Sequence, residues 1–214
     1  MRTLIVLALL WTPLSSEAVE PYCNDELFTS QTTDVKQAKV SATENGKLHF
    51  RGNGKDCPDS AQCIQKAYLV AGDKLIVSKS TNDWTCGLFF GKKQVFIGWL
   101  PTKNLEISPV KSVPQLGDWA KIWYSGQHGE ISIRLKGSDL EVSGSTLGDC
   151  RERPDGYYCN EGGFAGKAAP VGDLLTISSG YSCTVRMRLV SNYLIVTDDG
   201  VCGGMNVSFS DIYR

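Results

Sequence analysis

The sequence predicts an all-β protein made of two small disulfide-stapled domains, of which the second is an antiparallel β barrel or sandwich. Three observations predict the all-β class and the division into two. Apolar and polar residues alternate with a period of two along most of the chain, as in half-buried strands. Turn sequences rich in Gly, Asn and Asp recur between these runs. Eight cysteines divide four and four around a Pro-containing joint.

The first 18 residues are expected to form an export signal. Arg2 gives a positive start, the run from Leu4 to Trp11 is apolar but too short to span a bilayer, and Ser16-Glu17-Ala18 offers small residues to a signal peptidase. We expect cleavage after Ala18. The expected product is soluble and periplasmic or secreted, with no membrane insertion.

The chain is almost neutral, with a formal net charge of -1, which is relevant to whether it binds nucleic acid. Charges of both signs are interspersed along the chain, and no long basic run is present. Net charge and its distribution are the sequence signature of proteins that bind nucleic acid or anionic membranes. The sequence therefore gives no reason to expect nucleic acid as a partner.

The cysteines of an exported chain with an even count in each half are expected to form disulfides. Zinc is disfavoured because no C-x-x-C pair is present, so we expect neither a metal nor another cofactor. Four cysteines allow three pairings in each half. In the second half, a turn lies midway between the two cysteines of each favoured pair. In the first half, a short loop between two cysteines favours one pair, and the last two cysteines are left to pair with each other. The expected pairs are Cys150–Cys159, Cys183–Cys202, Cys57–Cys63 and Cys23–Cys86.

The strands follow from the alternating runs, taken in chain order. In the first half, the turns Glu44-Asn45-Gly46-Lys47 and Ala71-Gly72-Asp73 separate the runs, and only 59–66 could form a short helix or a stapled loop. In the second half, Ile131 to Leu135, Leu140 to Val142 and Cys183 to Leu189 each alternate with polar residues.

A break in the alternation predicts the domain boundary. Residues 108–114 read Ser-Pro-Val-Lys-Ser-Val-Pro, a composition typical of a linker. The predicted organisation is therefore a β domain at 19–108, a linker at 109–115 and a Cys-rich antiparallel domain at 116–214. About 90 residues on each side suffice for a small β fold that disulfides reinforce.

Part of the first domain, roughly 39–107, resembles the bacterial SH3-like domain of exported proteins. The resemblance rests on the Gly72-Asp73 turn before a strand, the aromatic strand from Trp84 to Phe89, and the Gly98-Trp99 pair before the closing strand. It implies a five-stranded barrel. Some members of that family resemble cell-wall-binding modules, so the resemblance also implies a non-catalytic binding role.

The C-terminal segment 193–214 resembles the end of a β module in uncharacterised proteobacterial periplasmic proteins that carry lysozyme-inhibitor-like segments. Its distinctive sequence is Cys202-Gly203-Gly204-Met205-Asn206-Val207. The resemblance implies a periplasmic location and a β fold. No inhibitory segment can be matched residue by residue, so it assigns no activity.

Aromatic residues beside polar turns are the candidate binding residues, because aromatic side chains suit extended ligands. The candidates are Tyr68, Trp84, Trp123 and Tyr124. The alternative for each is packing in a small core, where large aromatics are common.

Catalysis is not expected from the residues available. The chain has only two histidines, and neither lies in a nucleophile-elbow or H-E-x-x-H sequence. Cysteine nucleophiles are excluded if all eight are bridged. We therefore expect a binding protein for a cell-wall peptide or glycan, or for a periplasmic protein that acts on the wall. The alternatives are an immunity or inhibitor protein for a secreted toxin or lysozyme-like hydrolase, and a hydrolase.

Overall fold

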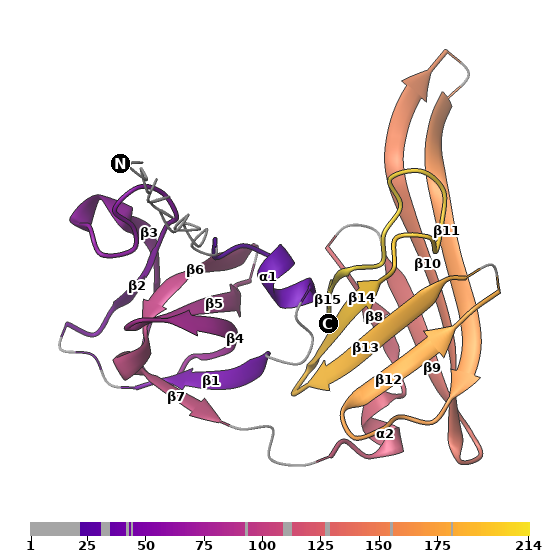
Figure 1. Ribbon diagram of the computed structural model, residues 1–214, viewed down its shortest axis with the longest axis horizontal. Helices are drawn as coiled ribbons and strands as arrows, with labels where there is room; N and C mark the ends of the chain where they lie inside the picture. The colour runs from indigo at the N-terminus through magenta and orange to yellow at the C-terminus, as the bar shows by residue number, and fades with distance from the viewer. Residues whose placement is uncertain are drawn as a thin grey trace, which may run out of the picture.

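The computed structural model describes residues 22–30, 35–41, 43, 45–92, 94–108, 113–126, 129–154, 156–180 and 182–214. The expected signal peptide and residues 109–112 of the expected linker lie outside these ranges. Strands β1 to β15 form three antiparallel sheets (Figure 1), which confirms the all-β class. No helix in the described ranges is long and apolar enough to cross a membrane.

The first half of the chain, 22–108, contains one seven-stranded sheet with the order β3-β2-β6-β5-β4-β1-β7. Its strands are β1 (Lys36–Val40), β2 (Leu48–Arg51), β3 (Ile64–Leu69), β4 (Lys74–Thr81), β5 (Trp84–Phe90), β6 (Val95–Pro101) and β7 (Leu105–Ser108). Within 59–66, where a helix or stapled loop is expected, a single 3-10 turn (Ala61–Cys63) leads directly into β3.

One face of this sheet encloses its own core. The core residues are Ala38, Val40, Leu48, Phe50, Leu69, Leu75, Val77 and Leu100. Since Leu69 comes from one end of the strand order and Ala38 from near the other, the sheet must curl around this cluster. No hydrogen-bonded pair of described residues joins β3 to β7, so the sheet remains open where a closed barrel is expected.

The central strands of this sheet are buried on both faces. β4 has four consecutive buried residues, from Leu75 to Ser78, instead of an alternation. Leu75 and Val77 enter the curled core, whereas Ile76 faces the opposite side. Continuous apolar runs of this kind are typical of strands that are covered on both faces.

The second half, 113–214, contains two four-stranded sheets with the orders β11-β10-β9-β8 and β12-β13-β14-β15. The elements are α2 (Leu116–Trp119), β8 (Ile122–Tyr124), β9 (Glu130–Lys136), β10 (Asp139–Arg153), β11 (Gly156–Ala168), β12 (Leu174–Ser178), β13 (Thr184–Val190), β14 (Tyr193–Asp198) and β15 (Asp211–Tyr213). Side chains from both sheets share one core, which includes Ile131, Val142, Phe164, Met187 and Leu194. The two sheets therefore pack face to face, as in a sandwich.

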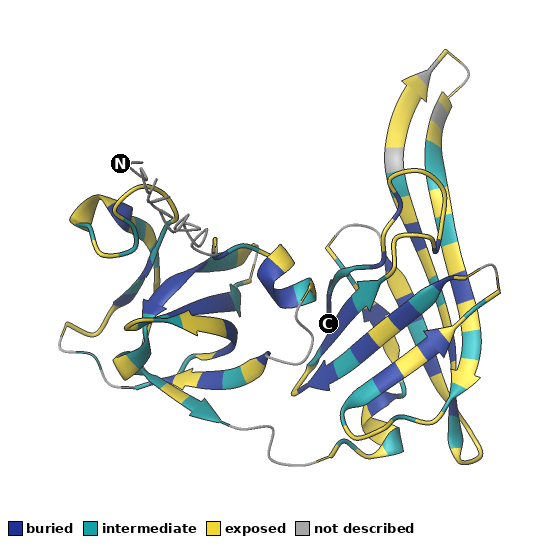
Figure 2. Ribbon diagram, viewed as in Figure 1, coloured by how far each residue is buried: buried dark blue, intermediate teal, exposed yellow. Residues whose placement is uncertain are grey.

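A further cluster of buried side chains joins the two halves, and we call it the shared cluster. The short helix α1 (Glu26–Thr29) places Leu27 and Phe28 against both halves (Figures 1 and 2). The buried members are Cys23, Leu27, Phe28, Val35, Ile76, Cys86, Leu88, Trp99, Val190, Ile195 and Ile212. Burial of this apolar surface holds the halves together.

Polar and aromatic contacts reinforce the shared cluster. Ser78 Oγ donates a hydrogen bond to the carbonyl of Leu27 at 3.0 Å, and Thr197 Oγ1 donates one to the carbonyl of Thr29. The rings of Phe90 and Tyr193 stack across the halves with their centroids 4.7 Å apart. The N-terminal segment thus bridges the two halves.

All eight cysteines are bridged, and none of the four disulfides joins the two halves. The pairs are Cys23–Cys86, Cys57–Cys63, Cys150–Cys159 and Cys183–Cys202, which are the pairs expected from the sequence. Four disulfides indicate an oxidising, extracytoplasmic environment.

Candidate functional site

The candidate site is a surface pocket of about 360 Å³ in the first half, which we call the Trp84 groove. Its lining combines three aromatic side chains with amide, hydroxyl and carboxyl groups. The lining residues are Tyr22, Asn53, Gly54, Cys57, Pro58, Asp59, Thr81, Asn82, Trp84 and Trp99. Four chain segments that are separate in sequence meet here.

Trp84 is the only one of the four candidate aromatics that lies in this groove. It begins β5 after the turn at Asn82, whose φ of 48° lies in the left-handed region that Asn tolerates. Its Nε1 donates a hydrogen bond to Asp59 Oδ1 at 2.9 Å, and the Arg51 guanidinium lies 5.0 Å from the centre of its ring. The ring is therefore held in a fixed orientation while it remains partly exposed.

Arg51 also orders the loop that forms the opposite wall. Its Nη1 donates to the carbonyl oxygens of Pro58 at 3.0 Å and Ser60 at 2.9 Å. The Cys57–Cys63 disulfide closes the same loop. Asp59 is therefore positioned against Trp84 by one cation and one covalent bridge.

Asn53 fixes the other end of the groove. Its Oδ1 accepts hydrogen bonds from Trp99 Nε1 and from the backbone N–H of Cys23, both at 2.9 Å, and its Nδ2 donates to the Cys23 carbonyl at 3.0 Å. The Cys23–Cys86 disulfide ties this segment to β5. The hydrogen bonds of Asn53 and this disulfide together place Tyr22, which is 61% exposed, at the rim.

Tyr68 and Tyr124 are exposed but stand apart from the groove, at 46% and 52% exposure. Tyr68 lies on the edge strand β3, where the Lys47 ammonium is 4.5 Å from the centre of its ring. Tyr124 ends β8, and its backbone exchanges two hydrogen bonds with Arg214. The predicted aromatics therefore do not form one surface.

The prediction that Trp123 is an exposed binding residue is wrong. Trp123 is 1% exposed, belongs to the core of the second half, and donates from Nε1 to the Trp119 carbonyl at 3.0 Å. The reason is the facing of β8, in which Ile122 and Tyr124 point outward and the residue between them points into the sandwich.

Sequence reasoning missed Tyr22, Asn53, Asp59 and Asn82. Tyr22 precedes a bridged cysteine, and Asp59 lies inside the Cys57–Cys63 loop. The predicted disulfides are therefore the sequence signal that could have indicated both residues. The Asn residues carry no local signal for a binding site. Their role depends on contacts such as that between Asn53 and Cys23, which are 30 positions apart.

A second surface feature is a β arm, formed by residues 146–153 of β10 and 156–162 of β11. The pairing of β10 with β9 ends at Ser145, after which β10 and β11 pair with each other up to Arg153 and Gly156. Figure 1 shows this hairpin projecting beyond the sandwich. Leu147 and Tyr158 are exposed on it, and the Cys150–Cys159 disulfide links its strands.

The loop 202–207 braces the base of the arm. Asn160 Nδ2 donates to the Met205 carbonyl at 2.6 Å, and the Gly163 N–H donates to the Cys202 carbonyl at 3.2 Å. The contact is so close that a Cβ on Gly148 would lie 2.3 Å from the Asn206 carbonyl oxygen. Glycine is therefore required where the loop crosses the arm.

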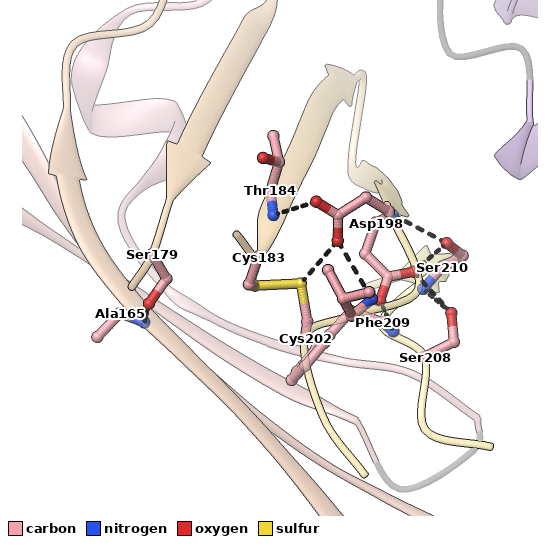
Figure 3. The surroundings of a disulfide bond; sticks show 11 residues. Ala165, Ser179, Cys183, Thr184, Asp198, Cys202, Ser208, Phe209 and Ser210 are labelled. Carbon is pink, nitrogen blue, oxygen red and sulfur yellow. Dashed lines mark hydrogen bonds between the residues drawn. A yellow bond between two sulfur atoms is a disulfide. The ribbon is translucent and has the colours of Figure 1, made fainter. Parts of the chain in front are cut away.

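The loop is itself anchored at both ends (Figure 3). Cys202 is bridged to Cys183. Downstream, the Asp198 carboxylate accepts hydrogen bonds from the hydroxyls of Ser208 and Ser210, each at 2.7 Å, and from the Phe209 N–H at 3.2 Å. This carboxylate holds the chain in place as it enters β15.

Comparisons with protein-family models, with curated proteins and with solved structures give no match for this chain.

Proposed function

We propose that this chain is an exported, non-catalytic binding protein that recognises cell-wall material, a peptide or a glycan, through the Trp84 groove. The oriented Trp84 ring is the observation that carries the proposal. Aromatic faces with adjacent amide and carboxyl groups provide both apolar contact and hydrogen bonds to an extended polar ligand. The disulfides that fix the groove lower the entropic cost of binding.

The SH3-like relationship of residues 39–107 belongs to this proposal. It is supported by the order of the features along the chain, since the Gly72-Asp73 turn precedes β4, the aromatic strand is β5, and Gly98-Trp99 lies in β6. A periplasmic or secreted location is likewise proposed, and the four disulfides support it.

The test is retention of the mature protein on purified peptidoglycan. We expect Trp84→Ala to weaken retention at least tenfold, because truncating an aromatic at a contact costs about 2 kcal/mol or more. Tyr124→Ala is the matched control, since it removes an exposed ring outside the groove and should leave retention unchanged.

Trp84 also contacts Arg51 and Asp59, so the variant could lose stability as well as a ligand contact. Tyr22→Ala separates the two effects, because Tyr22 lies in the groove and is mostly exposed. If Tyr22→Ala keeps the wild-type melting temperature and wild-type retention, and Trp84→Ala loses retention only by unfolding, the proposal is wrong.

The β arm favours a second candidate, an inhibitor or immunity protein that inserts the arm into the cleft of a lysozyme-like hydrolase. A stapled, braced hairpin with exposed Leu147 and Tyr158 is preorganised for insertion into a concave partner. We expect Leu147→Ser/Tyr158→Ser to abolish any inhibition of purified lysozyme. Val171→Ser, at an exposed valine outside the arm, is the control. Absence of inhibition by the wild type contradicts this candidate for that enzyme class.

Nothing in the groove or the arm favours the third alternative, a hydrolase.

A further inference from the structure

A cleft of about 510 Å³ lies between the two halves, away from the Trp84 groove. One wall comes from β1, the start of β4 and the end of β7. The other comes from the segment around α2 and β8 and from the β13–β14 turn. The lining residues include Lys39, Lys74, Asp118, Lys121, Trp123 and Asn192.

Three lysines gather in this cleft from separate parts of the sequence. Lys39 lies on β1, Lys74 begins β4, and Lys121 precedes β8. A chain whose formal net charge is -1 therefore carries a local concentration of positive charge at this place. Three of the four charged residues in the lining are basic, and such an excess of one sign in a cleft focuses the potential on a ligand of the opposite sign.

Lys39 and Lys74 are direct cross-strand partners in the β1–β4 register. Like charges directly opposite each other on paired strands are destabilising. Glu106, opposite Lys39 on β7, offers partial compensation, with 3.6 Å between Lys39 Nζ and its Oε2. Both side chains of that ion pair are more than half exposed, so it is worth little.

The one acidic residue of the lining, Asp118, offsets at most one of the three lysine charges. The Asp118 carboxylate accepts a hydrogen bond from the Gln115 N–H at 2.8 Å, as part of the capping box of α2. Lys74 and Lys121 form no ion pair with any residue in the described ranges. These two lining residues therefore have no carboxylate partner in the described part of the chain.

The cleft is also preorganised. The Lys121 ammonium lies 3.6 Å from the centre of the Trp123 ring, and Trp123 is buried, so this cation has a rigid support. The shared cluster holds the two walls together. The Asn192 amide adds hydrogen-bonding groups to the rim.

We propose that this cleft is a binding site for a phosphate-bearing ligand, with Lys74 and Lys121 as its principal contacts and Lys39 as a third. Its lining contains lysine but no arginine. Its contacts to a phosphate group would therefore be those of the point charges that lysine supplies, and not the bidentate contacts of an arginine fork. A bound phosphate would relieve the repulsion between Lys39 and Lys74.

The test is calorimetric titration of the mature protein with inorganic tripolyphosphate at low salt. Lys74→Gln/Lys121→Gln should bind at least tenfold more weakly than the wild type. The matched control is Lys66→Gln/Lys136→Gln, which removes two exposed lysines outside the cleft and should bind like the wild type. The melting temperature of Lys74→Gln should equal or exceed that of the wild type, because a like-charge pair is removed.

A second measurement distinguishes the source of the phosphate. Capture on vesicles that contain phosphatidylglycerol, lost in Lys74→Gln/Lys121→Gln, supports a lipid headgroup. Tripolyphosphate binding without vesicle capture supports a soluble phosphate polymer. No tripolyphosphate binding by the folded wild type, or equal weakening in both double variants, overturns the proposal.

Discussion

At the scale of single residues, hydrogen bonds and strand facing decide which tryptophans can meet a ligand. Trp84 keeps part of its ring exposed because its Nε1 is engaged by Asp59 at the surface. Trp123 is buried because the middle residue of β8 faces the core. Residues 122–124 are all apolar or aromatic, so no period-two pattern in the sequence distinguishes the inward face from the outward face.

Asp59→Ala should weaken ligand binding more than it weakens the fold. Removal of the carboxylate frees the indole N–H at an exposed position, and a hydrogen bond of this kind contributes about 1 kcal/mol. We expect retention on peptidoglycan to fall several-fold while the melting temperature stays within a few degrees of the wild type. A large fall in melting temperature with unchanged affinity would show that Asp59 supports the loop alone.

The pH dependence of stability should include a contribution from Asp211. Burial raises the pKa of its carboxyl, while hydrogen bonds from the Ile212 N–H and the Ser125 hydroxyl partly oppose the increase. The folded state therefore retains this proton above the unfolded carboxyl pKa of about 3.9, and stability is lost as pH rises through the folded pKa.

Asp211→Asn should remove that contribution. The free energy of unfolding, measured by urea titration from about pH 4 upward, should fall less with rising pH in the variant than in the wild type. Identical pH dependence in the two proteins would mean that the carboxyl titrates alike in the folded and unfolded states.

At the scale of elements, the β arm depends on close backbone contact with the loop 202–207. Gly148→Ala should destabilise this contact by about 1–3 kcal/mol, as overpacking does elsewhere. The new Cβ would approach the Asn206 carbonyl oxygen, which belongs to the backbone and cannot rotate away. Gly117→Ala is the control, because nothing lies within 4 Å of the Cβ it would add.

Limited proteolysis of the arm is the measurement for this pair of variants. Faster cleavage in Gly148→Ala than in Gly117→Ala is expected. Equal cleavage rates would show that the arm keeps its conformation without the loop.

The sequence predicts the strands well where one face is exposed, as in β9 and β13, because apolar and polar residues then alternate along the strand. It predicts three of the disulfides because turns and a short loop place the partners together, and the fourth, Cys23–Cys86, follows only by elimination. The continuous burial of β4 and the open, curled sheet are not predictable in the same way, since both depend on contacts between segments far apart in the chain. The Trp84 groove and the cleft lined by Lys39, Lys74 and Lys121 are unpredictable for the same reason, because each is formed by segments far apart in the chain.

At the scale of the whole molecule, the shared cluster couples the two halves. A fragment of residues 116–214 alone would expose Val190, Ile195 and Ile212, which are buried against the first half. The predicted linker at 109–115 therefore joins halves that also share buried apolar surface. Stability should therefore depend on α1, which contributes Leu27 and Phe28 to that cluster.

Phe28→Ala should lower the stability of both halves together, by about 3–5 kcal/mol, because it leaves a cavity in the shared cluster. Phe28 is fully buried there. One cooperative unfolding transition, shifted as a whole in calorimetry, is the expected result. Two separate transitions, of which only one moves, would show that the halves unfold independently.

Binding through the Trp84 groove is the central claim, and NMR of the indole N–H signals tests it most directly. Soluble peptidoglycan fragments should shift the signals of Trp84 and Trp99, which line the groove, and leave those of Trp119 and Trp123, which lie in the core of the second half. Shifts confined to the second half, or no shift at saturating fragment, would contradict the claim.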